Sequence, residues 1–244
     1  MTYEFYKGST KIKRIYYGSQ QINQVYKGST LVWKLHPYAP NTVMYESSTA
    51  GDSSTLNLEA GLYRVVLIGG GGGGCGLGTW VGSGMVTAHG SAAGGGSGAG
   101  LDCIINIPKG SYNVTVGSGG SGKAKGDVRD TLQKASNGTA SKFGSLSAGG
   151  GTGGSGKGGD TNTATAGSGG SQPSITYTHT TIYLQTAGNS GGKTTSKDTS
   201  VSGGSSIYSS KGKGGNAKSG YGNYTGTASD GGAGYVKVIY IGQP

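Results

Sequence analysis

The stretch "IGGGGGGCGLG", residues 68–78, directly follows "LYRVVL", an apolar and β-branched run that is typical of a buried β-strand. Six consecutive glycines offer no side chain to bury, and glycine loses more backbone freedom on ordering than any other residue. The stretch is therefore either a slack linker or a segment in which the absence of side chains serves the fold. The choice between them decides what kind of protein this is.

Glycine runs recur along the chain, in which 55 of the 244 residues are glycine. Seven more runs follow, at 94–100, 117–122, 149–159, 167–170, 188–192, 212–215 and 231–234. Strand-like segments accompany them at 42–46, 54–58, 62–68, 101–107, 111–117 and 235–241. The last of these is a strong strand whose partners must lie far back in the sequence. The region between these strands is therefore enclosed in one domain. A free linker would not need a strand at its end to close it.

Energetics favour an ordered role for the glycine runs. Ordering a residue costs about 1–2 kcal/mol of backbone entropy, and a hydrogen bond returns roughly 1 kcal/mol net. A polyglycine II helix has three residues per turn and no internal hydrogen bonds, so only side-by-side packing satisfies its N–H and C=O groups. The six core glycines are expected to form one such helix near the middle of a bundle: Gly69, Gly70, Gly71, Gly72, Gly73 and Gly74.

The predicted fold is all-β and has essentially no α-helix. Residues 1–35 hold a decad repeat, "YKGSTKIKRI", "YYGSQQINQV" and "YKGSTLVWKL", which predicts one short strand and one Gly-Ser turn per unit in a β-meander or β-spiral. Residues 36–54 read as a connector and a first strand. Residues 55–244 form the glycine-rich domain, an antiparallel β-framework that encloses the polyglycine II bundle.

Composition limits the possible functions. The formal charge is +10, from 20 Lys and Arg against 10 Asp and Glu, which favours an anionic partner such as envelope phosphates, or simply solubility. The lysines are scattered, so a nucleic-acid partner is not predicted. There is no apolar run of membrane-spanning length, and no signal peptide opens the chain. Cys75 and Cys103 either pair across one loop or remain reduced, semi-buried thiols, and the second reading is favoured.

The segments "LYRVVLIGGGGGG", "SYNVTVGSGGSG" and "GGAGYVKVIYIG" resemble the glycine-rich domain of bacteriophage tail-fibre and tail-tip adhesins, over roughly residues 55–244. The resemblance to the T-even type implies a sandwich of polyglycine II helices whose connecting loops recognise a host cell-surface receptor, either a glycan or a protein. It also implies a place in the virion tail, after assembly in the host cytoplasm. Residues 1–35 are then expected to dock onto other tail proteins or onto copies of the same chain. The N-terminal repeat departs from the T-even pattern.

Aromatic and polar residues between the glycine runs are the candidates for receptor contact, because rings on polar loops give rigid contact area. The alternative is that these rings pack on the glycine lattice and cover its faces. Nearby Lys193, Lys197, Lys211 and Lys218 could meet phosphates. The receptor-binding candidates are Trp80, Met85, His89, Tyr177, His179, Tyr183, Tyr208, Tyr221 and Tyr224.

No catalytic, cofactor or metal site is predicted. "AGNSGGKT", residues 187–194, fits a relaxed P-loop pattern, but no helix-forming sequence follows it. His36, His89 and His179 are isolated and lack zinc-ligand spacing. The closest carboxylate pair, Asp127 and Asp130, reads as a solvated turn. A non-enzymatic adhesin is therefore the leading hypothesis, a purely structural virion protein is its rival, and a glycan depolymerase is a weaker third.

Overall fold

The computed structural model describes residues 6–7, 10–11, 15–17, 19–34, 36–78, 90–125, 131–158, 163–220 and 225–243. The chain divides into two units, Met1–Pro40 and Asn41–Pro244, called unit 1 and unit 2. All regular secondary structure in the described residues is β-strand, as the sequence predicted. No helix long and apolar enough to span a membrane occurs among them.

Unit 1 contains one antiparallel hairpin for each ten-residue repeat. The sequence predicted one strand per repeat, whereas the structure has two, because the residues on either side of each Gly-Ser pair form strands that pair with each other. In the third hairpin Lys27 pairs with Thr30, so Gly28 and Ser29 form a two-residue loop, and Gly28 has a φ of 63°. The hairpins are β1 (Tyr6–Lys7) with β2 (Thr10–Lys11), β3 (Ile15–Tyr17) with β4 (Gln20–Ile22), and β5 (Gln24–Lys27) with β6 (Thr30–Lys34).

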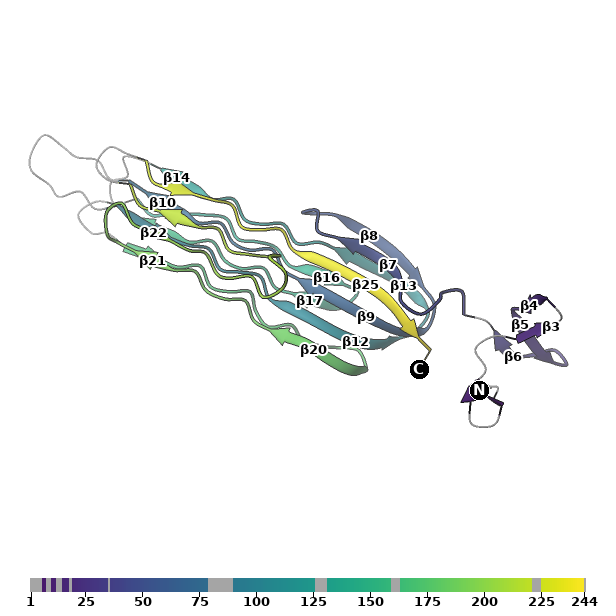
Figure 1. Cartoon of the computed structure of the whole chain (residues 1–244). Coiled ribbons are helices and arrows are strands. Elements are labelled where there is room, and N and C mark those ends of the chain that lie inside the picture. The colour runs from purple at the N-terminus through teal and green to yellow at the C-terminus, as the bar shows by residue number, and fades with distance from the viewer. Residues whose placement is uncertain are drawn as a thin grey trace, which may run out of the picture. The chain divides into compact units, whose positions relative to one another are not determined.

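Unit 2 begins with a framework of two antiparallel sheets, which lie together at one end of the unit (Figure 1). The larger has the order β20-β12-β9-β25-β7 and contains β7 (Thr42–Ser47), β9 (Gly61–Ile68), β12 (Gly100–Ile107), β20 (His179–Thr186) and β25 (Tyr235–Gly242). The smaller has the order β17-β16-β13-β8 and contains β8 (Ser53–Leu58), β13 (Gly110–Thr115), β16 (Ser141–Phe143) and β17 (Leu146–Ala148). Strand β25 pairs with β7 and β9, which confirms the predicted long-range closure.

The hydrophobic core lies between the two framework sheets, where β16 packs against β9 and β25. Successive side chains along β9 and β12 point to opposite faces of the sheet, so one face of each strand points into this core. Tyr63 and Tyr240 meet edge to face at 5.3 Å, and Tyr112 stacks on Phe143 at 5.3 Å. This small aromatic core anchors the ends of the glycine segments.

The six glycines that leave β9 form an ordered helix with a three-residue repeat. Their N–H groups donate in turn to carbonyls of three antiparallel neighbouring segments. Gly69 and Gly72 donate to segment 96–99, Gly70 and Gly73 donate to segment 136–139, and Gly71 and Gly74 donate to segment 229–232. The carbonyls from Gly70 to Gly74 accept from three parallel neighbours, at 117–123, 149–154 and 212–215. A three-residue repeat with only external hydrogen bonds is polyglycine II. The predicted ordered and buried segment is confirmed.

A second central segment, residues 94–99, lies antiparallel to the first and also has six neighbours. Its N–H groups donate in rotation to 189–192, 212–215 and 149–152. Its carbonyls accept from 69–72, 167–170 and Gly204. Two adjacent centres in a hexagonal arrangement share two neighbours and have eight in all, and eight surrounding segments are found in the described residues.

These ten segments, called the glycine lattice, are arranged in rows of three, four and three. The outer rows are 135–140, 149–154 and 166–170 on one side, and 202–204, 212–216 and 229–234 on the other. The middle row is 117–122, 69–74, 94–99 and 188–192. The eight outer segments surround the two central ones in sequence order, each antiparallel to the one before. Figure 1 shows the segments running side by side away from the framework toward the opposite end of unit 2, called the distal end.

Side chains on the outer segments accept hydrogen bonds from N–H groups that have no carbonyl partner in the lattice. Asn137 Oδ1 accepts from Gly153 N at 2.9 Å, and Asp230 Oδ1 accepts from Gly122 N at 2.7 Å. Where the lattice meets the framework, Ser141 Oγ donates to Ile68 O at 2.5 Å and accepts from Gly117 N at 2.9 Å. Polar residues in the outer segments therefore complete the hydrogen bonding of the lattice surface.

Candidate functional site

The three rows of the lattice end in three small β-sheets at the distal end. The middle row becomes the sheet β14-β10-β11-β21, and the outer rows become β15-β18-β19 and β22-β23-β24. The strands are β10 (Cys75–Leu77), β11 (Ser91–Ala93), β14 (Lys123–Lys125), β15 (Gln133–Lys134), β18 (Ser155–Lys157), β19 (Thr163–Thr165), β21 (Lys193–Thr194), β22 (Ser200–Val201), β23 (Ala217–Lys218) and β24 (Thr227–Ala228). The sheets hold the rows in register at the point where the chain turns back.

A buried cluster joins the middle sheet to one outer sheet. Cys75 and Leu77 of β10 pack with Ala135, and all three side chains are buried. Cys75 Sγ donates to Gln133 O at 3.7 Å, and the buried Ser91 Oγ donates to Lys157 O at 2.9 Å. Side chains thus replace the glycine-to-glycine bonds at this end and make it a rigid base.

Five chain connections depart from this base. They lie between β10 and β11, β14 and β15, β18 and β19, β21 and β22, and β23 and β24. Most of these connections, namely 79–89, 126–130, 159–162 and 221–224, lie outside the described residues. The described residues that flank each one belong to the distal sheets, so the topology brings all five connections to one end of unit 2.

The connection between β21 and β22, residues 195–199, is held by the buried Ser219. Ser219 Oγ donates to Ser196 O at 2.6 Å and accepts from Thr199 N at 3.0 Å. Asp198 has a φ of 50° and forms an ion pair with Lys218 at 2.6 Å. This connection is therefore a fixed turn that presents polar side chains, among them the exposed Lys197.

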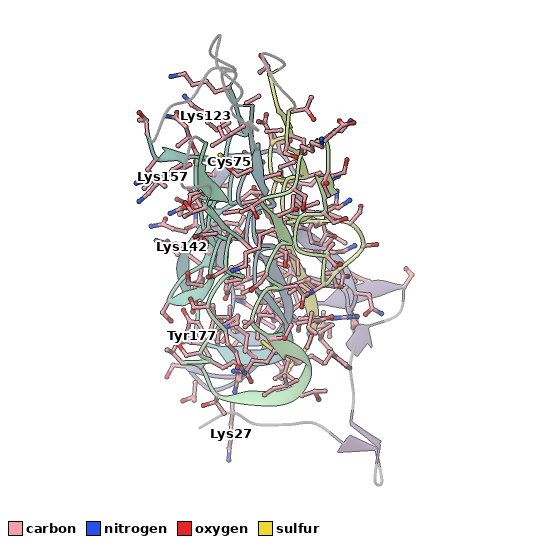
Figure 2. All side chains as sticks on the ribbon, turned by 90° about the vertical axis from the view of Figure 1, so that its left-hand side faces the viewer. Lys27, Cys75, Lys123, Lys142, Lys157 and Tyr177 are labelled. Carbon is pink, nitrogen blue, oxygen red and sulfur yellow. The ribbon has the colours of Figure 1, made fainter. Side chains whose placement is uncertain are left out.

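The distal end is rich in lysine. Lys123 and Lys125 of β14 are exposed, as is Lys193 of β21, and Lys157 of β18 is half-buried. Figure 2 looks at unit 2 from this end, with Cys75 inside it and Lys123 and Lys157 nearby. No ion pair to these lysines occurs among the described residues, whereas Lys109 and Lys237 on the framework pair with carboxylates.

Five of the nine candidates predicted from sequence lie in two of the distal connections. Trp80, Met85 and His89 lie in the first distal connection, and Tyr221 and Tyr224 lie in the last. All five are outside the described residues, as is the side chain of His179. Their flanking residues, such as Gly78 and Gly90, or Gly220 and Thr225, belong to the distal end.

Three other candidates lie on the framework and pack against it. Tyr177 lies edge-on to Tyr112 at 6.4 Å, and its hydroxyl accepts from Ser145 N at 3.3 Å. Tyr183 of β20 is 56% exposed, with the Arg64 guanidinium 4.8 Å from its ring centroid. Arg64 is itself bound by both carboxylate oxygens of Asp102, at 2.8 and 2.7 Å.

Tyr208 is the third of these candidates. The Tyr208 ring stacks on Tyr235 with the ring centroids 5.9 Å apart, and it packs against the buried Val66 and Ile68. Lys211, which was predicted to meet phosphates, follows Tyr208 in the same turn. Of the nine predicted residues, the structure therefore places Tyr177, Tyr183 and Tyr208 beside the framework, while the five in the first and last distal connections lie outside the described residues.

The sequence reasoning missed two lattice segments: 135–140 contains a single glycine, and 202–204 contains a glycine run of only two residues. It also missed the acceptor side chains, such as Asn137 and Asp230. A usable signal was present: in several outer segments the non-glycine residues recur every third position, as with Ser118 and Ser121. In a helix with three residues per turn, residues at this spacing lie on one face, and in the outer segments that face points away from the lattice.

The remaining motifs have structural roles. Residues 188–192 of the P-loop-like stretch form a lattice segment that continues into β21 and not into a helix. Cys75 and Cys103 are free and buried, and burial raises the pKa of each thiol to about 11. Within the described ranges, no group of three His, Cys, Asp or Glu side chains could hold a metal ion.

An all-β framework that carries a polyglycine II lattice defines this chain as a glycine-rich β-domain protein. The family model described as "Glycine-rich domain" matches residues 47–242, which is most of the chain. The protein therefore belongs to the glycine-rich domain family. No curated protein shows a significant match to the sequence.

Proposed function

We propose that this protein is a bacteriophage tail-fibre or tail-tip adhesin that binds a host cell-surface receptor without catalysis. The observation that carries the proposal is the gathering of five chain connections at the distal end of a rigid lattice. The chain enters unit 2 at β7, on the framework, so these connections lie at the opposite end from the entry point.

The lattice is well suited to presenting a recognition surface. Successive residues of each central segment are hydrogen-bonded to different neighbours, so a segment cannot slide without breaking bonds on several sides. The support fixes the ends of these connections, which reduces the part of the binding entropy cost that comes from positioning them. Their sequences can change without affecting the support, which suits a protein that follows a varying receptor.

The distal lysines favour a receptor that carries phosphate or carboxylate groups. Exposed Lys123, Lys125 and Lys193 place positive charge at this end, and within the described residues they have no acidic partner. Binding that depends on them should weaken as salt is raised, because screening shortens the reach of exposed charges to about 8 Å at physiological ionic strength.

The test is saturable binding of fluorescently labelled full-length protein to a panel of bacterial strains. Replacing residues 79–89 by a Gly-Ser segment of equal length should abolish binding, whereas the same replacement at 171–176, beside the framework, should leave it unchanged. Absence of saturable binding to every strain would refute the adhesin proposal and favour a structural virion protein. Release of reducing sugars from envelope glycans would instead indicate a depolymerase.

A further inference from the structure

A pocket of about 500 Å³ opens beside the framework, away from the distal end. One wall is the end of β7 and the residues after it, and the facing wall is the turn at 205–211 between two lattice segments. Its volume lies in the range of roughly 300–1,000 Å³ typical of ligand pockets. The lining that matters here comprises Glu46, Ser47, Thr49, Tyr208, Lys211 and Tyr235.

The carboxylate of Glu46 is fixed in place and ionised. Tyr235 Oη donates to Glu46 Oε1 at 2.6 Å, and Lys237 Nζ lies 3.0 Å from Glu46 Oε2. The hydrogen bond from Tyr235, followed by that from Lys237, lowers the pKa of this carboxyl. Each carboxylate oxygen can still accept a further hydrogen bond from a ligand.

The aromatic and cationic groups of the pocket come from the opposite wall. Tyr208 stacks on Tyr235 with an angle of 20° between the rings, and Lys211 Nζ lies 5.8 Å from the centroid of the Tyr235 ring. Lys211 makes no ion pair within the described residues. The pocket therefore combines the half-buried ring of Tyr208, the ammonium of Lys211, several hydroxyls and a carboxylate that is paired with Lys237.

The turn that carries Tyr208 and Lys211 is strained and tightly held. Ser209 and Ser210 have φ values of 44° and 63°, the left-handed region that disfavours residues with a β-carbon. A hairpin turn of this kind is best served by Asn-Gly. Ser206 Oγ fixes the turn by donating to Lys211 O at 2.6 Å. Strained residues that the surroundings hold in place are common at ligand sites.

We infer that this pocket binds one pyranose residue of a saccharide. The apolar face of a sugar ring packs on an aromatic ring, here that of the half-buried Tyr208, its hydroxyls donate to a carboxylate, and its oxygens accept from ammonium and hydroxyl groups. The polar lining disfavours a lipid or another apolar ligand. The site is separate from the distal connections and does not depend on the proposed function.

The test uses isotope-labelled full-length protein, titrated with the methyl pyranosides of glucose, galactose, mannose and N-acetylglucosamine. At least one should produce saturable amide shifts at residues 46–49, 208–211 and 235 in NMR spectra, with residues 195–199 unaffected. No saturable shift with any of the four sugars overturns the inference. Shifts confined to the distal end overturn it as well.

Variants then assign the binding to the pocket. Tyr208→Leu keeps apolar packing on Val66 and Ile68 but removes the ring, and Lys211→Met removes the ammonium. Each should weaken binding about tenfold, the equivalent of one good contact, while the spectra confirm an intact fold. Tyr183→Leu, at an exposed ring outside the pocket, is the matched control and should bind as the parent does. Unchanged binding in both pocket variants overturns the inference.

Discussion

Substituting Gly72 by alanine tests the central claim about the lattice, because it adds one carbon to the middle of the first central segment. Gly72 N donates to Gly96 O and Gly72 O accepts from Gly215 N, both at 2.8 Å. A β-carbon built at this position would come closer than 3.0 Å to the backbone of Thr152 and Gly153. Backbone atoms cannot swing aside, so the whole segment 149–154 must move away.

The cost follows from the bonds that this movement breaks. The segment is tied to the central helix by the bonds from Gly151 N to Gly70 O and from Gly154 N to Gly73 O, both 2.9 Å. Breaking the two bonds leaves four buried backbone groups without partners, two N–H and two C=O, and each unpaired buried group costs about 1–3 kcal/mol. The four groups together cost about 4–12 kcal/mol, compared with a total free energy of unfolding of roughly 5–15 kcal/mol for a folded domain. Even the lower value would reduce the melting temperature by about 8–16 °C.

The assay compares thermal and urea unfolding of Gly72→Ala with Gly192→Ala in the full-length chain. Gly192 is also in a lattice segment, but its added β-carbon would approach Ser202 O and Val201 Cβ no closer than 3.5 Å, which is ordinary contact. The control should therefore melt as the parent does, or slightly higher through reduced unfolded-state entropy. Equal melting temperatures for the two variants would refute the close-packed lattice and return the six glycines to the role of a linker.

Two further predictions concern the lattice surface and the thiols. Asn137→Ala should lower the free energy of unfolding by about 1 kcal/mol, because it removes the acceptor of Gly153 N. The control variant Ser190→Ala, on another outer segment, should leave the free energy of unfolding unchanged. Equal urea midpoints for the two variants would contradict the role of Asn137. Cys75 and Cys103 should resist a thiol reagent until the protein unfolds. Because burial raises their pKa from 9.0 to about 11, their contribution to stability is complete below pH 9 and is lost as the pH rises toward 11. Rapid labelling of the native protein, or unfolding midpoints that do not fall between pH 9 and 11, would contradict this.

The local pattern of the chain was enough to predict the all-β class, the main framework strands and the ordered state of residues 69–74. These features follow from short-range properties: alternating apolar residues mark a half-buried strand, and a glycine run can be ordered only by packing against others like it. The long reach of β25 to β7 and β9 followed from the same reasoning, because a strong terminal strand needs partners.

The order of the lattice was decided only by tertiary structure. Glycine segments look alike in sequence, and nothing in "GSGG" says which neighbour accepts which N–H group. The rows of three, four and three arise because every N–H group of the two central segments finds a carbonyl on a neighbouring segment. Short-range pattern also could not distinguish Tyr208 beside the framework from Tyr221 in a distal connection, since both sit in polar, glycine-flanked inserts. The direction of each segment through the lattice determines the end at which its insert emerges, and that direction depends on contacts between residues far apart in the chain.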